Sequence, residues 1–236
     1  MNYDVNNYNQ YTGASTLQST VASAMKKVYV KMTIALLVTA VVALFCSTSQ
    51  TFIQFYVTNR WFMWAMVILE LGMVFGISAG ISKLSSPTAT GLFYLFAVVN
   101  GLMLTPIFMV YTMTSIAKTF FITAGTFGAM SIFGYTTNQD LTKIGNILFM
   151  ALIGLIIASV VNIFTHSTTL DWIISIAGVI IFVGLTAWDT QQIKRMAQMM
   201  PADQVGRLAT LGALSLYLDF INLFLYLLRF FGSSRD

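Results

Sequence analysis

The carboxyl-terminal part of the chain contains the stretch LGALSLYLDFINLFLYLL at residues 211–228, which places Asp219 deep inside an apolar run of helix length. An ionised Asp near a bilayer centre costs roughly 2.5–3.5 kcal/mol on insertion scales, so such a residue usually faces a partner or a water-filled path. A second aspartate, Asp189, ends the preceding apolar run. The two aspartates together indicate a proton- or cation-handling site within a membrane.

The composition is that of a membrane protein. Of the 236 residues, 57% are hydrophobic and 8% are charged, whereas soluble domains carry about 25% charged residues. A helical crossing of a hydrocarbon core about 30 Å thick needs about 20 apolar residues. The short alternating strands of an outer-membrane barrel do not describe the long unbroken runs of this chain. We therefore predict an all-α polytopic membrane protein with about seven transmembrane helices.

The apolar runs divide the chain into three parts. We expect residues 1–25 to be a polar, disordered cytoplasmic tail, residues 26–232 to be the seven-helix transmembrane domain, and residues 233–236 to be a short carboxyl-terminal tail. The expected crossings are Lys31–Ser49, Trp61–Ile81, Thr88–Met113, Thr119–Thr137, Ile144–Phe164, Leu170–Gln191 and Leu208–Phe231.

The positive residues predict the orientation, because cytoplasmic loops are enriched in Lys and Arg. Eight of the 12 basic residues fall on one side: Lys26, Lys27, Lys31, Lys83, Lys143, Lys194, Arg195 and Arg207. The other four, Arg60, Lys118, Arg229 and Arg235, fall on the opposite side. This bias favours a cytoplasmic amino terminus and, with seven crossings, an external carboxyl terminus. It also explains the net charge of +4 without a nucleic-acid partner.

Few residues are available for enzymatic chemistry. The one cysteine, Cys46, lies in an apolar run, and the one histidine, His166, lies in an expected external loop, so no thiolate metal site can be built. No metalloprotease, nucleophile-elbow or phosphate-loop motif is present. Paired aspartates keep an intramembrane aspartyl protease open as an alternative, but neither Gly-x-Gly-Asp nor Tyr-Asp surrounds them. We therefore expect a protein that is not an enzyme and has no cofactor.

Only three acidic residues lie inside apolar runs: Glu70, Asp189 and Asp219. The short link between the last two crossings makes them antiparallel neighbours, so a lateral Asp189–Asp219 pairing is expected, at depths that differ by several ångströms. The last crossing also carries a polar stripe, because steps of three and four residues place side chains on one side of a helix. The stripe consists of Ser215, Asp219, Asn222, Tyr226 and Arg229.

The second crossing carries the repeated G-x-x-x-G pattern Gly72, Gly76 and Gly80. Small residues at this spacing allow the backbones of two membrane helices to approach closely. We expect these glycines to serve helix packing.

Two carboxyl groups a few ångströms apart at low dielectric disfavour double ionisation, so such a pair holds a proton near neutral pH. The shared proton would hold the last two helices together. Its loss would leave two anions that repel and that offer oxygen ligands to a hard cation such as Ca²⁺. Two or three carboxylates are too few for a high-affinity calcium cage.

Three segments resemble the signature segments of the Bax inhibitor-1 family: TAWDTQQIK at 186–194, ALSLYLDFINLF at 213–224 and LRFFG at 228–232. The resemblance extends from Lys26 to Gly232. It implies seven membrane helices with the last one central, and a pH-sensitive calcium leak activity.

By this resemblance, Asp189 and Asp219 are the paired aspartates that couple pH to opening and that bind Ca²⁺ weakly and transiently. Glu70 matches an acidic position of the second helix, and Lys83 stands near the place where the bacterial members carry arginines. Ser215, Asn222 and Tyr226 are expected to support the ion pathway because they share the stripe. The short carboxyl-terminal tail and the absence of an organellar signal favour a bacterial inner membrane.

A different class of function remains open. The chain is also compatible with a non-transporting interaction protein that binds a membrane protease or a stress or cell-death regulator, in which the aspartates only fix helix packing. Ion movement by the purified protein alone distinguishes the two functions.

Overall fold

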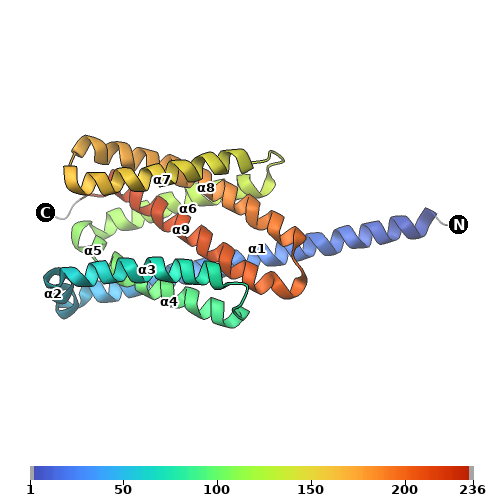
Figure 1. Cartoon of the computed structure of the whole chain (residues 1–236), viewed down its shortest axis with the longest axis horizontal. Helices are drawn as coiled ribbons and strands as arrows, with labels where there is room; N and C mark the ends of the chain where they lie inside the picture. Colours follow the sequence, from blue (N-terminus) through green and yellow to red (C-terminus); the bar gives the residue numbers. More distant parts are fainter. Residues whose placement is uncertain (1–2, 234–236) are drawn as a thin grey trace.

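The structure is a computed structural model that describes residues 3–233, with side chains described from Gln18 onward except at residue 202. Figure 1 shows an elongated bundle of helices. The helices described are α1 (Tyr3–Thr48), α2 (Gln50–Thr58), α3 (Arg60–Gly80), α4 (Ser86–Leu104), α5 (Ile107–Val110), α6 (Met113–Thr136), α7 (Thr142–Thr165), α8 (Thr168–Met199), the 3₁₀ turn η1 (Ala202–Gln204) and α9 (Val205–Phe231).

Seven helical segments within this range are long and apolar enough to cross a membrane, which confirms the predicted all-α polytopic fold. They are Gln18–Thr48, Arg60–Gly80, Ser86–Val110, Met113–Thr136, Thr142–Thr165, Thr168–Met199 and Val205–Phe231. The amino terminus and the α3–α4, α6–α7 and α8–α9 connections lie at one end of the bundle, which we call the amino-terminal side (Figure 1).

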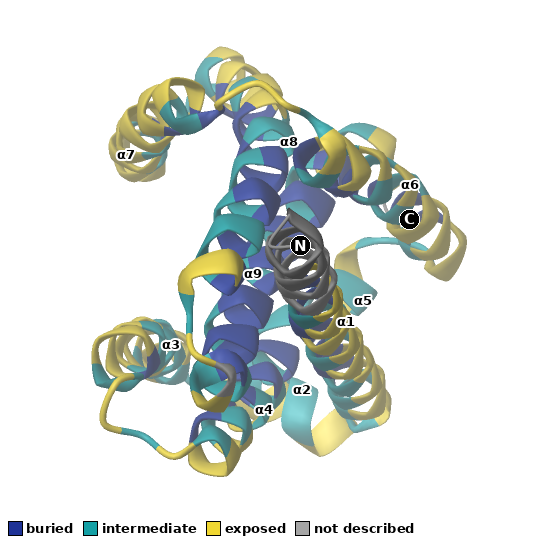
Figure 2. Cartoon of the chain, turned by 90° about the vertical axis from the view of Figure 1, so that its right-hand side faces the viewer, coloured by how far each residue is buried: buried dark blue, intermediate teal, exposed yellow. Residues whose placement is uncertain are grey.

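Helix α9 occupies the centre of the bundle, as the sequence predicts. Of the apolar part of α9, 67% is buried, against 6% for both α3 and α7. Figure 2 shows α9 as a dark buried strip, with α8 and α7 on one side of it and α3 and α4 on the other. A helix that is apolar on nearly all faces has to be enclosed by other helices.

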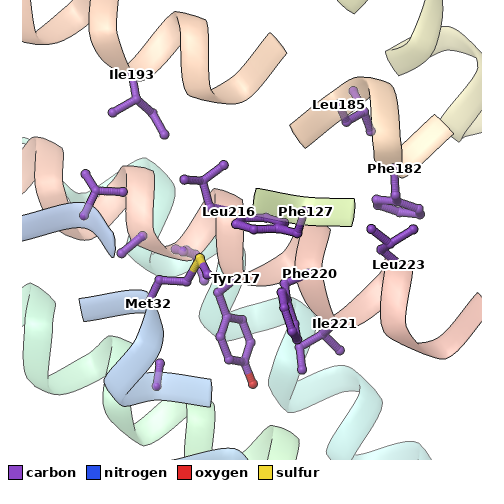
Figure 3. Packing of buried hydrophobic residues seen from close by; sticks show 14 of the residues in the cluster. Met32, Phe127, Phe182, Leu185, Ile193, Leu216, Tyr217, Phe220, Ile221 and Leu223 are labelled. Carbon is purple, nitrogen blue, oxygen red and sulfur yellow. The ribbon is translucent and has the colours of Figure 1, made fainter. Parts of the chain in front are cut away.

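The core is built around the large side chains of α9. Tyr217 and Leu223 are fully buried, and Phe220 is 3% exposed. The Phe220 ring contacts the ring of Phe127 in α6 edge to face, with 5.5 Å between centroids. Figure 3 shows Tyr217 beside Met32 of α1, and Leu223 farther along α9 beside Phe182. Rings that interlock in this way fix the position of α9 relative to α1 and α6.

Helix α1 begins earlier than the sequence predicts. Met1 and Asn2, in the predicted disordered tail, lie outside the described residues, and from Tyr3 the backbone is helical. Val21, Ala24 and Met25 are buried in the core. These apolar residues recur at steps of three and one, so they continue the buried face of the membrane helix into the polar segment. For residues 18–25 the structure therefore has a packed helix in place of the expected tail.

Other boundaries also differ from the prediction. The expected crossing 88–113 is interrupted between α4 and α5 at Thr105 and Pro106, because Pro has no backbone N–H to continue a helix. Helix α8 continues past the predicted end at Gln191 as far as Met199. Asp189 therefore lies about 15 Å from the end of its helix rather than near it.

The glycine pattern of α3 does not serve packing within the chain. A Cβ atom added at Gly72 or Gly76 would meet no atom within 4 Å, and at Gly80 it would meet only the Leu84 side chain of the following turn. The expectation of close helix packing through these glycines is therefore wrong for this chain. The cause is that α3 packs through its other face, on which Ile77 is 2% exposed.

Candidate functional site

The two aspartates of the apolar runs come together between α8 and α9. Asp189 is partly buried and its Oδ2 atom accepts a hydrogen bond from the Ser215 hydroxyl of α9. Asp219 lies one helical turn beyond Ser215 and is 5% exposed. The two carboxyl groups interact electrostatically. Asp189 and Ser215 therefore join α8 to α9 at this level, and a direct pairing of the two aspartates stays a prediction.

Asp219 is the less satisfied of the two aspartates. Its Oδ2 atom is buried and has no hydrogen-bond partner among the residues that the structure describes. Polar atoms buried in this way are rare in native structures and often mark a functional requirement. The unpaired oxygen makes Asp219 a candidate functional residue.

A cavity of about 280 Å³ reaches the pair from the amino-terminal side. Asp189 and Ser215 contribute polar groups to its wall, together with Ser78 of α3 and Gln192 of α8. Asp219 is not part of this wall. Asp189 is thus the member of the pair that a water-filled space can reach, and Asp219 lies behind it.

On the other side of Asp219, the interface between α8 and α9 is closed by apolar and aromatic side chains. The ring of Tyr226 stacks on Phe182 with 5.9 Å between centroids and an interplanar angle of 24°. The same ring covers Gly178, where an added Cβ would approach it to 2.6 Å. Leu223 lies near Phe182 and is fully buried (Figure 3). These side chains therefore fill the α8–α9 interface between Asp219 and the far end of the bundle.

The polar stripe of α9 faces several partners rather than one continuous path. Asn222 donates from Nδ2 to the carbonyl of Leu218 in its own helix, at 2.8 Å. Arg229 pairs with Asp171 at 3.0 Å, at the far end of α8. Ser215 is the stripe residue that contacts the second aspartate.

Glu70 belongs to a second polar group that lies away from the pair. Its Oε1 atom accepts a hydrogen bond of 2.9 Å from Nδ2 of Asn100 in α4. The Oδ1 atom of Asn100 accepts from the Tyr217 hydroxyl at 3.0 Å, and this hydroxyl lies 2.6 Å from the Thr39 hydroxyl of α1. The chain of contacts therefore connects α3, α4, α9 and α1.

In this second polar group, the Thr39 and Tyr217 hydroxyls have fewer protons to donate than they have hydrogen-bonding contacts. Thr39 also donates to the carbonyl oxygen of Ala97 at 2.9 Å, so two hydroxyl protons serve three contacts. Tyr217 and Thr39 therefore have alternative proton arrangements within one geometry. Asn100 and Tyr217 were missed from the sequence because their contact depends on how α4 packs against α9.

Two lysines of the amino-terminal side, Lys83 and Lys31, differ in their surroundings. Lys83 is exposed after the end of α3 and, within the described range, forms no ion pair with Asp189 or Asp219. Lys31, which the sequence indicated only as an orientation signal, is half-buried and donates to Thr90, Thr210 and the Gly206 carbonyl at 2.8, 2.7 and 3.2 Å. It fixes α1 to α4 and to the start of α9.

The loop between α6 and α7 contacts the carboxyl-terminal part of α8, which lies at the amino-terminal side of the bundle. Asp140 forms an ion pair of 2.9 Å with Arg195 of α8. Hydrogen bonds from Thr142 and from the Arg195 guanidinium lower the pKa of the Asp140 carboxyl to about 2. Gln191 of α8 accepts from the Leu141 backbone at 2.9 Å. These contacts explain why α8 extends as a helix beyond the apolar run.

The site offers few ligands for a cation. Within the part of the chain that the structure describes, no three His, Cys, Asp or Glu side chains are grouped so that they would hold a metal ion. Ca²⁺ takes six to eight oxygen ligands. A calcium ion at Asp189 and Asp219 would therefore need the Ser215 hydroxyl, backbone carbonyls and water in addition.

Comparison with known proteins gives a consistent assignment. Residues 21–236 match the family model described as "Inhibitor of apoptosis-promoting Bax1". The chain is 50% identical over 214 residues to the inner membrane protein YbhL of Escherichia coli (strain K12), covering 89% of this chain and 92% of YbhL. It is 50% identical to a protein of Borreliella burgdorferi over 90% of this chain and 92% of the relative. A Rickettsia prowazekii protein, RP147, is 45% identical over 90% of each chain.

Proposed function

Because the chain belongs to the Bax inhibitor-1 family, we propose that it is a pH-sensitive calcium leak pathway whose opening is controlled by the protonation of Asp189 and Asp219. The proposed activity is transport without enzymatic chemistry, and it needs no cofactor. The relative YbhL is named an inner membrane protein, which supports the bacterial inner membrane as the location. The distribution of Lys and Arg supports a cytoplasmic amino terminus and an external carboxyl terminus.

The observation that carries the proposal is the buried carboxyl of Asp219. Its Oδ2 atom has no hydrogen-bond partner among the described residues. The Asp219 carboxyl also interacts electrostatically with a second carboxyl group, that of Asp189. A buried charge without a cation is strongly destabilising, so such a pair is weak as a structural device. A carboxyl pair that gains or loses a proton accounts for this arrangement.

The mechanism follows from the closed interface between α8 and α9. With one proton shared, the two carboxyl groups attract, and the aromatic layer at Tyr226 and Phe182 stays packed. When pH rises and the proton leaves, the two anions repel and favour separation of α8 from α9. Ca²⁺ entering through the cavity beside Asp189 then meets two carboxylates and the Ser215 hydroxyl. We expect more flux at higher pH.

The test is calcium flux into liposomes that contain only this protein, between pH about 5 and 8. The variants Asp189→Asn and Asp219→Asn are compared with the parent and with Asp140→Asn. Asp140 is the matched control, because it is an aspartate exposed in the α6–α7 loop, away from the pair. Flux that rises with pH in the parent and the control, and that loses its pH dependence in both pair variants, is the expected result.

The opposite outcome points to the other class of function. If folded protein gives no flux above that of empty liposomes at any pH, the transport proposal is wrong. The protein is then better described as an interaction protein that modulates another membrane protein. The description of the matching family, "Inhibitor of apoptosis-promoting Bax1", agrees with that function.

A further inference from the structure

A long apolar groove runs between α1 and α6, with α9 as its floor. The groove has a volume of about 700 Å³, which is within the range of about 300–1,000 Å³ typical of ligand sites. Its wall includes Met25 and Leu36 of α1, Ala124 and Gly128 of α6, and Phe220 of α9. Both α1 and α6 pack against α9 but only weakly against each other, so the groove opens sideways toward lipid.

The length of the groove matches one leaflet of a bilayer. Its α6 wall extends from Phe120 to Tyr135, a span of about 22 Å at 1.5 Å per residue. A bilayer including its headgroup regions is about 40–45 Å thick, so one leaflet is about 20–22 Å. The Tyr135 end lies at the amino-terminal side, where α6 ends in the loop to α7.

A polar atom in the groove wall lacks a partner. Ser131 is 5% exposed and lines the groove, and its hydroxyl has no hydrogen-bond partner within the described part of the chain. It lies one helical turn, about 6 Å, inside the Tyr135 end. The ester groups of a phospholipid lie at a similar depth below its phosphate. Once the Ser131 side chain turns toward the groove, an ester carbonyl would accept the proton of its hydroxyl.

Two lysines, Lys194 and Lys26, place positive charge at the Tyr135 end of the groove. Lys194 of α8 lies over the Tyr135 ring, 4.8 Å from its centroid, and donates to the Tyr135 carbonyl at 2.6 Å. Lys26 is exposed and precedes the groove residues Tyr29 and Thr33 by three and seven positions, which places it on the groove face of α1. An ammonium group has three donors, so Lys194 retains donors for an anion.

We propose that this groove binds one anionic phospholipid of the leaflet on the amino-terminal side. An acyl chain lies along Phe127 and Phe220, the ester group meets Ser131, and the phosphate lies between Lys26 and Lys194. The acyl chain thus contacts the apolar wall, the ester group contacts the single hydroxyl, and the phosphate contacts the two cations. Because Phe220 follows Asp219 in α9, the bound chain supports the helix that carries the buried carboxyl.

The chain offers a matched pair of variants to test this site. Gly128 lines the groove and Gly125 does not, although both lie in α6, and an added Cβ meets no atom within 4 Å at either position. Gly128→Leu would therefore place a side chain in the groove from an uncrowded Cβ position, whereas Gly125→Leu places the same side chain outside the groove. Delipidated full-length protein in mild detergent is mixed with dioleoyl phosphatidylglycerol, and bound lipid is counted by native mass spectrometry.

The parent and Gly125→Leu are expected to retain one phosphatidylglycerol, and Gly128→Leu is expected to lose it. Glycerol 3-phosphate without acyl chains should not bind, which separates a lipid site from a phosphate site. Lys26→Gln should weaken phosphatidylglycerol binding about fivefold, because a lysine near an anionic lipid contributes about this factor. Lys118→Gln, at the opposite end of α6, should leave binding unchanged.

Equal retention of lipid by the parent and Gly128→Leu would overturn the proposal. The same conclusion follows if the mass of a dimer without lipid is found, since the groove would then take a second copy of the chain. Lys26 is an exposed position, so Lys26→Gln is a second test that does not depend on how the groove tolerates leucine. Unchanged affinity of Lys26→Gln would contradict the placement of the phosphate. All of these readouts are independent of calcium flux.

Discussion

Replacing Asp219 by leucine should make the protein more stable and abolish the proposed pH response of calcium flux. The side chains of Asp and Leu have the same number of heavy atoms and branch at the same carbon, so Asp219→Leu keeps the shape of a site that is 5% exposed. It removes a buried carboxyl oxygen that has no partner among the described residues. Leaving one such polar atom buried costs about 1–3 kcal/mol, and this cost disappears in the variant.

The expected gain is therefore about 1–3 kcal/mol in the free energy of unfolding, which corresponds to roughly 2–12 °C in melting temperature for a chain of this size. The gain should be larger at pH 8 than at pH 5, because the proposed mechanism leaves both carboxyl groups charged at the higher pH. Thermal unfolding of detergent-solubilised protein, followed by tryptophan fluorescence at both pH values, measures it. Asp219→Asn is the control: it keeps a polar group in the same place and should gain less.

A fall in melting temperature of more than about 2 °C for Asp219→Leu, near 1 kcal/mol for this length, would refute the reasoning. It would show that the carboxyl group stabilises the helix packing, as in the non-transporting alternative. A stabilised variant that still shows the parent's pH-dependent flux would separate stability from transport and would remove Asp219 from the gating pair.

Three further predictions concern other parts of the bundle. Tyr217→Phe removes the hydroxyl that donates to the side-chain Oδ1 atom of Asn100. It should destabilise the protein by about 1–3 kcal/mol, measured as a lower melting temperature. Gly134→Ala places a methyl group against the backbone of α8 and should cost about 1–3 kcal/mol or more, while Gly125→Ala in open space should not lower the melting temperature. The pKa of Asp140 is lowered to about 2 in the folded protein. Asp140 therefore stabilises the fold above pH about 4 and loses this effect as the pH falls toward 2. Asp140→Asn should leave the pH dependence of stability between pH 5 and 8 unchanged in thermal melts.

The main features of the fold could be read from the sequence because a bilayer imposes a simple length rule. Seven apolar runs of about 20 residues predict seven crossings, and all seven are present. The ends of the helices were less predictable, since hydropathy does not limit a helix once it leaves the membrane. Helix α8 continues to Met199 because Gln191 and Arg195 find partners in the α6–α7 loop, and such tertiary contacts leave no local pattern.

The aspartate pair was predictable because a carboxylate in an apolar run is rare and expensive. The partners of the other polar residues were not. Glu70 was recognised, but its contact with Asn100 depends on how α3 packs on α4. Lys31 was used only as an orientation signal, whereas the structure places its ammonium group among three oxygen acceptors of two other helices. Which neutral oxygens surround a charge is decided by packing rather than by spacing along the chain.

If the protein conducts ions as proposed, the path between α8 and α9 has two barriers in series, and only the first contains carboxyl groups. The cavity on the amino-terminal side ends at Asp189 and Ser215, and the stacked rings of Tyr226 and Phe182 close the path beyond Asp219. A change of charge at the pair acts directly on the separation of α8 and α9, and the aromatic layer spans the same interface. In the proposed mechanism, loss of the proton therefore opens the second barrier through movement of α9, because Tyr226 and Phe182 lie on the same two helices as the aspartates. This coupling requires α9 to move as one helix, which its buried central position favours.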